Sequence, residues 1–155
     1  MAGQTLNTLE LMNGTDGCLF VEIDGTNVPL LELENFSITA NFAAVQRQFV
    51  GDPVIKSVPT GVSFALTYTE SVVRDDIIME PLLASVKRGK FPHYNFQGKV
   101  EKPDGQEQRL GLNDLVPSGE FGLMNVTPGE IISRPMNFAI NTVPEFISAL
   151  AATYM

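Results

Sequence analysis

The sequence of 155 residues is long enough for one domain, and its 18 acidic and 10 basic side chains give a formal net charge of −8. Hydrophobic residues make up 44% of the chain and charged residues 18%, which excludes a wholly disordered protein. The negative charge disfavours a protein that adheres to nucleic acid or anionic lipid, because both would repel it. We therefore expect one domain over residues 1–155. We also expect it to be made and folded in a cytoplasm, because neither a secretion signal nor a membrane span is recognisable.

The first predicted elements are two short strands joined by a tight turn. Leu19, Val21 and Ile23 are apolar at alternate positions, as in a strand with one buried face. Asp24-Gly25 follows, and this pair favours a hairpin turn because glycine adopts a positive φ without a Cβ clash. The second strand is expected to begin near Val28.

The next strand changes phase along its length. Leu31 and Leu33 are apolar at odd positions, whereas Phe36 and Ile38 are apolar at even positions. Successive strand residues point to opposite faces, so this change predicts a β-bulge or a crossing between sheets near Glu34-Asn35.

Residues 43–60 have no clean period and contain two prolines and one glycine. They are predicted to form a long loop, and loops of this length in compact domains are usually functional. An ordinary hairpin built around Gly51-Asp52-Pro53 is an equal alternative.

A clear strand and a helix follow. Every second residue is apolar over 62–68, which predicts a half-buried strand. Residues 75–88 are predicted to be helical, with Ile78, Leu82 and Val86 spaced four apart on one face. We expect these three side chains to pack on the sheet.

The two ends of this helix have recognisable signals. Gly89 can form the C-terminal cap after the basic residues Lys87 and Arg88. Pro81 fits only in the first turn or at a kink, so the regular helix is expected to begin near Glu80.

The remaining elements are predicted from shorter patterns. Strands are expected at 93–100, 108–112, 119–126 and 130–141, with a turn at 103–105 and a short terminal helix at 145–153. Seven or so strands and one clear helix predict a mainly β sandwich or barrel, with the helix covering one end or flank.

The sequence contains no pattern that carries catalytic or metal-binding chemistry. Phosphate-binding, zinc-protease and nucleophile-elbow motifs are absent. The single cysteine, Cys18, excludes an intrachain disulfide, and the single histidine, His93, excludes a His–His metal pair. His93 is expected at a surface or interface. We therefore expect no enzyme activity, no cofactor and no metal ion.

Four stretches between residues 13 and 100 follow one another in a recognisable order. They are Asn13-Gly14 with Gly17 before Val21–Gly25, a strand leading into Val45, Gly51 and Lys56, a strand from Gly61 to Tyr68 and Arg74, and Lys87–Lys90 before Pro92. Together they resemble the tail tube proteins of contractile bacteriophage tails and of the defective-phage particle PBSX.

The resemblance implies a tail-tube-type β-sandwich or barrel with one flanking helix and a long inter-ring loop. It implies hexameric rings stacked into a conduit for DNA ejection, in a virion tail or phage-like particle. Sheath, tape-measure and baseplate proteins are the implied partners. DNA would pass without tight binding, because six copies of −8 give −48 per hexameric ring. The alternatives are the tube of a DNA-free bacteriocin-like or secretion particle and a small-molecule-binding β-barrel.

Two groups of residues follow as site predictions. Residues 43–60 are predicted to reach a neighbouring ring and to become ordered only there, because ordering a loop costs about 1–2 kcal/mol per residue. The predicted inter-subunit or inter-ring contacts are Val45, Arg47, Phe49, Val50, Val54, Lys56 and Val58. Glu32 and Glu34 are predicted to share one strand face and to line a negative lumen, although a solvated outer face explains them equally well.

Overall fold

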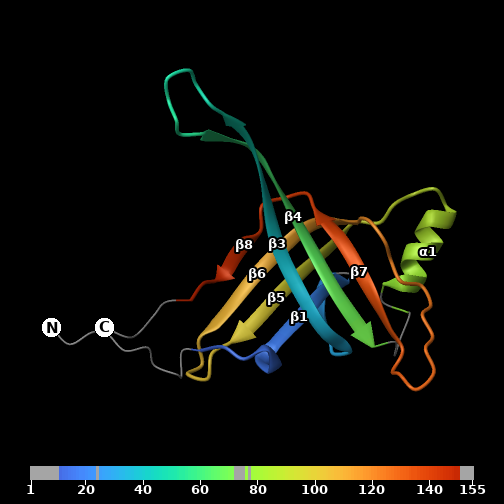
Figure 1. Ribbon diagram of the computed structural model, residues 1–155. Coiled ribbons are helices and arrows are strands. Elements are labelled where there is room, and N and C mark those ends of the chain that lie inside the picture. The colour runs from blue at the N-terminus through green and yellow to red at the C-terminus, as the bar shows by residue number, and fades with distance from the viewer. Residues whose placement is uncertain (1–10, 24, 72–75, 77, 151–155) are drawn as a thin grey trace.

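The computed structural model describes residues 11–23, 25–71, 76 and 78–150, which form an antiparallel sheet of eight strands with one α-helix at its flank (Figure 1). The mainly β fold expected from the sequence is confirmed. A 3-10 turn, η2 (Gly14–Asp16), precedes the first strand. The strands and the helix are β1 (Gly17–Ile23), β2 (Thr26–Leu30), β3 (Leu33–Arg47), β4 (Lys56–Ser71), α1 (Met79–Lys87), β5 (Tyr94–Glu101), β6 (Glu107–Pro117), β7 (Ser133–Ile140) and β8 (Glu145–Ser148).

The strand order is β2-β1-β5-β6-β7-β4-β3, with β8 paired to β6. Strand β6 connects the two halves of the sheet, because it pairs with β5 along one edge and with β7 and β8 along the other. The halves then lie face to face. A Cβ added at Gly98 of β5 would be 3.1 Å from Ile38 Cδ1 of β3, so glycine allows the two halves to approach closely.

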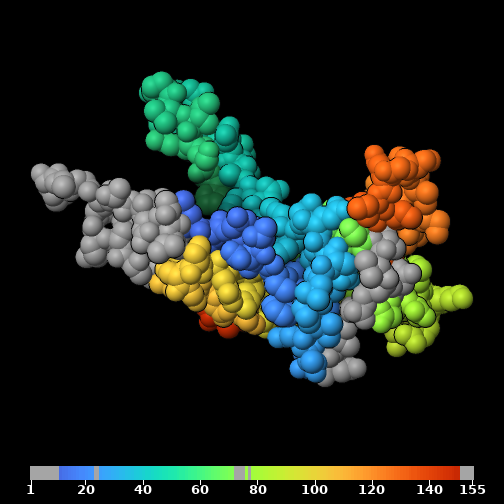
Figure 2. Space-filling view, turned by 90° about the horizontal axis from the view of Figure 1, so that it is seen from below, coloured from blue at the N-terminus to red at the C-terminus, as the bar shows by residue number. Residues whose placement is uncertain are grey.

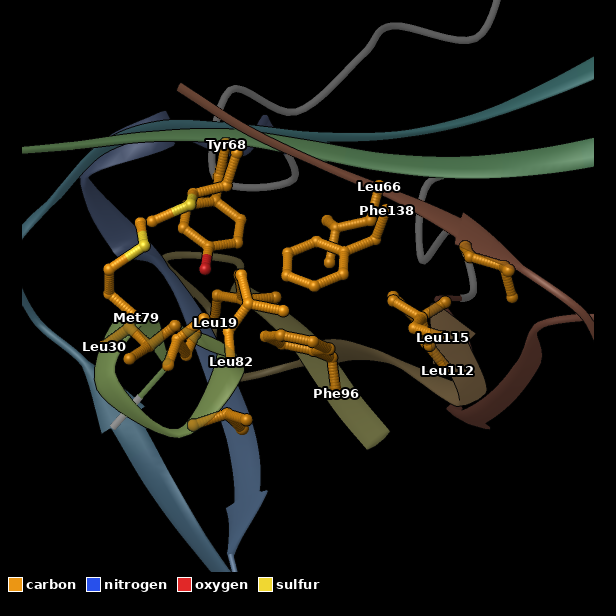
Figure 3. Close-up of a cluster of buried hydrophobic side chains, with 14 residues drawn as sticks. Leu19, Leu30, Leu66, Tyr68, Met79, Leu82, Phe96, Leu112, Leu115 and Phe138 are labelled. Carbon is orange, nitrogen blue, oxygen red and sulfur yellow. The ribbon is translucent and has the colours of Figure 1, made fainter. Parts of the chain in front are cut away.

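The hydrophobic core fills the space between the two halves (Figure 3). Leu19 and Phe96 point inward from one half, and Leu66, Tyr68 and Phe138 point inward from the other. The rings are in contact, with the Phe96 and Phe138 centroids 5.2 Å apart. The interior is therefore packed with side chains, as expected for a sandwich.

Helix α1 covers one end of this core. Met79 and Leu82 of the helix and Ile78 at its N-cap are buried, as the sequence predicted for Ile78 and Leu82. Val86, predicted to pack with them, is 46% exposed, so that prediction is wrong. Eight residues at about 100° each turn Val86 roughly 80° away from Ile78, which takes it off the buried face.

The ends of α1 agree with the expected signals. The helix begins at Met79, so Pro81 lies in the first turn, where no intrahelical N–H donor is needed. Gly89 has φ +76°, and its N–H donates to the Val86 carbonyl over 2.9 Å. The Lys90 N–H donates to the Ser85 carbonyl over 3.0 Å, which completes a Schellman-type cap.

The register of β3 with β4 and two glycine-containing turns also agree with the sequence predictions. The pairing of β3 with β4 shifts between Leu33 and Asn35, which confirms the expected irregularity. Gly25 has φ +79° between β1 and β2, and Gly105 has φ +99° between β5 and β6. Asp24, the other half of the first turn signal, lies outside the described residues.

Two predicted elements are wrong. Residues 145–148 form strand β8 instead of the start of a helix over 145–153, and residues 151–153 lie outside the described part of the chain. Pairing with β6 overrides the local helical pattern, because Gly111 of β6 leaves room for Ile147. The predicted strand at 119–126 lies within the connection between β6 and β7, where Gly119 adopts φ +74°.

No helix among the described residues is long and apolar enough to cross a membrane.

Candidate assembly interface

The most prominent feature is an arm, residues 40–63, formed where β3 and β4 continue beyond the sandwich (Figures 1 and 2). Strand pairing continues to Arg47 opposite Lys56. The predicted long loop over 43–60 is therefore wrong, and the hairpin alternative is confirmed with a connection of residues 48–55. A register shift between Ala43 and Ala44 interrupts the alternation of apolar residues along β3. The hairpin is exposed, so burial does not require either of its faces to be apolar.

The tip of the arm is held by Asp52. Its N–H donates to the Phe49 carbonyl over 3.1 Å, and its side-chain Oδ1 accepts from the Val54 N–H over 2.9 Å. Its other oxygen, Oδ2, lies 3.6 Å from Lys56 Nζ. Gly51 has φ +84°, which favours glycine at this position. The tip is thus a hydrogen-bonded turn that presents its side chains outward. Whether residues 43–60 become ordered only in the tube stays a prediction.

Apolar side chains on the arm lie in the open. Val50 is fully exposed and Phe49 is 62% exposed. The other predicted contact valines, Val45, Val54 and Val58, are also exposed. An exposed apolar surface of this kind marks a place where another molecule binds. Three further members of this surface were not predicted from the sequence: Phe42, Ile55 and Val62. Their apolar character within an exposed hairpin is the sequence signal that could have identified them.

The two predicted basic contacts lie directly opposite each other near the tip. Arg47 of β3 pairs in register with Lys56 of β4. Like charges at directly opposed positions destabilise a hairpin. Asp52 lies near Lys56, whereas Arg47 Nη1 donates to the Gln46 carbonyl over 3.4 Å. This arrangement favours a partner that brings a carboxylate to the arm.

The edge of β3 is a second surface available for assembly. Strand β3 ends the path of the sheet, and no strand within the described residues pairs with its outer edge. An unpaired edge offers backbone N–H and C=O groups to a strand of another subunit.

The two predicted lumen residues lie at one end of the sandwich and do not share a strand face. Glu32 is in the turn before β3, and its carbonyl accepts from the Ser71 N–H over 2.9 Å. Glu34 Oε1 accepts from Ser71 Oγ over 3.1 Å. The expected common strand face is therefore wrong, because the chain turns at Leu31-Glu32 and shifts register before Asn35.

The two outer faces of the sandwich differ in charge. Over residues 35–41 of β3, 63–69 of β4 and 133–139 of β7, the outward positions carry small, hydroxyl or amide side chains and no ionised group: Asn35, Ser37, Thr39, Asn41, Ser63, Ala65, Thr67, Thr69, Ser133, Pro135, Asn137 and Ala139. Glu34 lies just beyond this stretch, at the end of β3 beside Ser71. We call this surface the uncharged face. Row by row, Ser37, Thr67 and Asn137 lie side by side on adjacent strands.

The outer face of β1, β5 and β6 is ionic. Lys99 Nζ lies 2.8 Å from Glu101 Oε1 and 3.6 Å from Glu107 Oε2. Arg109 Nη1 donates to Gln97 Oε1 over 3.1 Å, and its guanidinium lies 5.5 Å from the Phe20 ring centroid. The side-chain hydrogen bond with Glu101 raises the pKa of Lys99, which therefore stays charged. Such a face suits contact with water or polar partners.

Titratable groups inside the sandwich have structural partners or apolar surroundings. Arg134 Nε lies 2.7 Å from Glu70 Oε1, and both side chains are buried. Burial raises the pKa of Tyr94 to about 12, and burial together with Glu70 raises the pKa of Tyr68 above its ordinary range. Burial likewise raises the pKa of the Cys18 thiol, which makes it a poor nucleophile.

The remaining polar candidates are accounted for by local structure. His93 contacts the Asp114 carboxylate on the surface, where the sequence placed it. Asp114 adopts φ +57° in an irregular part of β6, and its N–H donates to Asn95 Oδ1 over 3.0 Å. Over the described residues, no group of three or more His, Cys, Asp and Glu side chains is arranged to hold a metal ion.

Sequence comparison and structural comparison give different results. No protein-family model and no curated protein matches the sequence. Among solved structures, a chain of the SPP1 tail tube has a TM-score of 0.65 and 10% sequence identity, covering 91% of this chain and 81% of that chain.

Two further solved structures are similar. A chain of the sheath–tube complex of an extracellular contractile injection system, PVC, has a TM-score of 0.64 and 10% identity, covering 90% of this chain and 93% of that chain. A chain of the tail of an empty gene transfer agent particle with C6 symmetry has a TM-score of 0.61 and 14% identity, covering 89% of this chain and all of that chain. The resemblance to tail tube proteins is confirmed at the level of the fold.

Proposed function

We propose that this protein is the structural subunit of a phage or phage-like tail tube, in which hexameric rings stack into a hollow conduit. The observation that carries the proposal is the arm. It leaves the sandwich, is closed at its tip by a hydrogen-bonded turn, and exposes apolar side chains that a neighbouring subunit would cover. In the tube, Val45, Phe49, Val50, Val54 and Val58 make the inter-ring contacts, with Arg47 and Lys56 at their rim.

The open edge of β3 supports formation of a ring. Pairing of this edge with a strand of the neighbouring subunit joins six sandwiches into one closed sheet, and closure removes every free edge. The arm and the edge act in different directions, one between rings and one within a ring. A subunit with both features builds a tube.

The uncharged face is proposed as the wall of the lumen. Short hydroxyl and amide side chains, such as Thr39 and Thr67, offer a polyanion no basic group on which to stop. The excess of acidic side chains lies elsewhere on the chain, and Glu32 and Glu34 are proposed to lie at one mouth of each ring. DNA therefore passes through the tube without binding tightly. The conduit acts without catalysis.

Location and partners follow from the same proposal. The tube lies in the tail of a virion or phage-like particle, and its outer surface contacts sheath, tape-measure or baseplate proteins at its sides and ends. The same geometry serves the tube of a DNA-free particle, as in an injection system. A small-molecule-binding barrel is disfavoured, because Tyr68, Phe96 and Phe138 fill the interior (Figure 3).

Sedimentation of the purified protein tests the assembly proposal. Val50→Asp places a charge on the apolar tip and is expected to abolish stacking while leaving the fold intact. Val143→Asp is the matched control, because Val143 is an exposed valine between β7 and β8. We expect large polymers for the native protein and for V143D, and small oligomers for V50D. Identical sedimentation of V50D and V143D would contradict the role of the arm.

Size-selective labelling tests the lumen wall. In a Cys18→Ser background, Thr67→Cys places a thiol on the uncharged face and Asn113→Cys places one on the opposite half of the sandwich. After assembly, a small maleimide is expected to label both, and a bulky polyethylene-glycol maleimide is expected to label only N113C. Equal labelling of both thiols by the bulky reagent would show that the uncharged face is outside.

A further inference from the structure

An apolar groove lies between α1 and residues 118–132, the connection from β6 to β7. Its volume is about 820 Å³, and Leu83, Val86 and Leu123 are among its lining residues. All three are about half exposed. Nearby on the connection, Met124 and Ile131 are still more exposed. An exposed apolar surface of this kind is typical of a site that binds another molecule.

The groove and the arm lie at opposite ends of the same molecule. Strand β4 leaves the arm and ends at Ser71, which pairs with Ser133, the residue immediately after the connection 118–132. The strand has 16 residues, so about 50 Å separates its two ends. Figures 1 and 2 show α1 and the connection on the side of the sandwich away from the arm.

The groove and the arm are also complementary in character. Both expose aliphatic side chains. Residues 40–63 contain Arg47, Lys56 and Asp52 as their charged residues, a net charge of +1, whereas residues 118–132 contain only Glu120 and Glu130, a net charge of −2. Among the residues that line the groove itself, the charges of Glu80 and Lys87 cancel, and Arg134 is buried beside Glu70, so the −2 of the neighbouring connection remains. The opposed Arg47 and Lys56 favour a carboxylate-bearing partner, and this connection supplies two carboxylates next to the groove.

We propose that the groove between α1 and residues 118–132 receives the arm tip of a second copy of this chain. This inference rests on the proposed tube function and names the receiving surface. Val50 and its apolar neighbours enter beside Leu83 and Leu123, while Glu120 and Glu130 lie near Arg47 and Lys56. A contact between two different surfaces at opposite ends of one chain does not close on itself, so it repeats in one direction.

Complementation between two defective variants tests the contact directly. Val50→Asp disables the arm and keeps the groove, whereas Leu123→Asp disables the groove and keeps the arm. Each variant alone is expected to remain in short oligomers. Mixed in equal amounts, they are expected to form a complex of twice the mass, because the intact arm of L123D enters the intact groove of V50D. Val143→Asp, an exposed valine between β7 and β8, is again the matched control and is expected to polymerise like the native protein.

The outcomes separate this inference from the proposed function. If the native protein forms tubes and L123D forms them equally well, the groove is not the receiving surface, although the tube function stands. If the native protein forms no tube under any condition, the proposed tube function is wrong, and the inference that rests on it falls with it. In a Cys18→Ser background, Val50→Cys and Leu123→Cys on separate copies are expected to form a disulfide across the contact. Tubes without this disulfide would also overturn the inference.

Discussion

Replacing Leu82 with alanine tests how α1 holds the sandwich closed. Leu82 is 7% exposed and packs into the core with Met79, whereas its neighbour Leu83 is 49% exposed at the groove. Loss of a nearly buried leucine removes roughly 1.5–3 kcal/mol of transfer free energy. The remaining cavity raises the cost to about 2.5–4 kcal/mol, because the backbone of the sandwich relaxes only in part. Leu83→Ala is expected to cost under about 1 kcal/mol.

Urea unfolding followed by far-ultraviolet circular dichroism measures both variants. The Val50→Asp background is used so that arm contacts add no assembly energy. With a slope of roughly 2 kcal/mol per molar urea, the midpoint of Leu82→Ala is expected to fall by about 1–2 M. The midpoint of Leu83→Ala should hardly change. Equal midpoints for L82A and L83A would refute the assignment of Leu82 to the core and of Leu83 to the groove.

Three further predictions concern the cap, the tyrosines and the buried ion pair. Gly89→Ala is expected to cost about 1 kcal/mol in urea unfolding, because φ is +76°, whereas Gly61→Ala, in open space at ordinary φ, should cost less. Burial raises the folded pKa of Tyr94 to about 12 from the ordinary tyrosine value of about 10, so its contribution to stability is complete below pH 10 and is lost as the pH rises through 12. Thermal melts from pH 9 to about pH 12 should therefore show a falling midpoint, and the fall should be smaller in a Tyr94→Phe control, in which buried Tyr68 still contributes. Glu70→Gln is expected to destabilise by roughly 3 kcal/mol, because it removes the negative charge of a buried ion pair with Arg134, and combination with Arg134→Met should recover part of the loss in the same urea assay.

The parts of the fold that the sequence predicted are those with strong local signals. Strict alternation over 62–68 identified the core part of β4, because one of its faces is buried and the other is not. Gly89 and Pro81 located the ends of α1, because a positive φ and a missing N–H donor restrict those residues wherever they occur. The change of phase near Asn35 likewise appeared as a register shift.

The missed features depend on contacts that are distant in sequence. Ile147 belongs to a strand because Gly111, far away in the chain, leaves space beside β6. The arm lacks the burial that produces an alternating pattern, so residues 43–60 are predicted as a loop or a hairpin with equal weight, although half of them are paired as strands. Its contact residues could still be named from their apolar character. The groove was not predicted, because Leu123 and α1 are far apart in the sequence and line one groove in a fold where β7 pairs with β4.

Negative-stain electron microscopy of the purified native protein shows directly whether this chain builds a tube. We expect hollow tubes or stacked rings of one subunit type, six-fold in cross-section, that disappear in Val50→Asp and persist in Val143→Asp. A field of monodisperse monomers at every concentration, with tail components supplied as well as without them, would contradict this expectation.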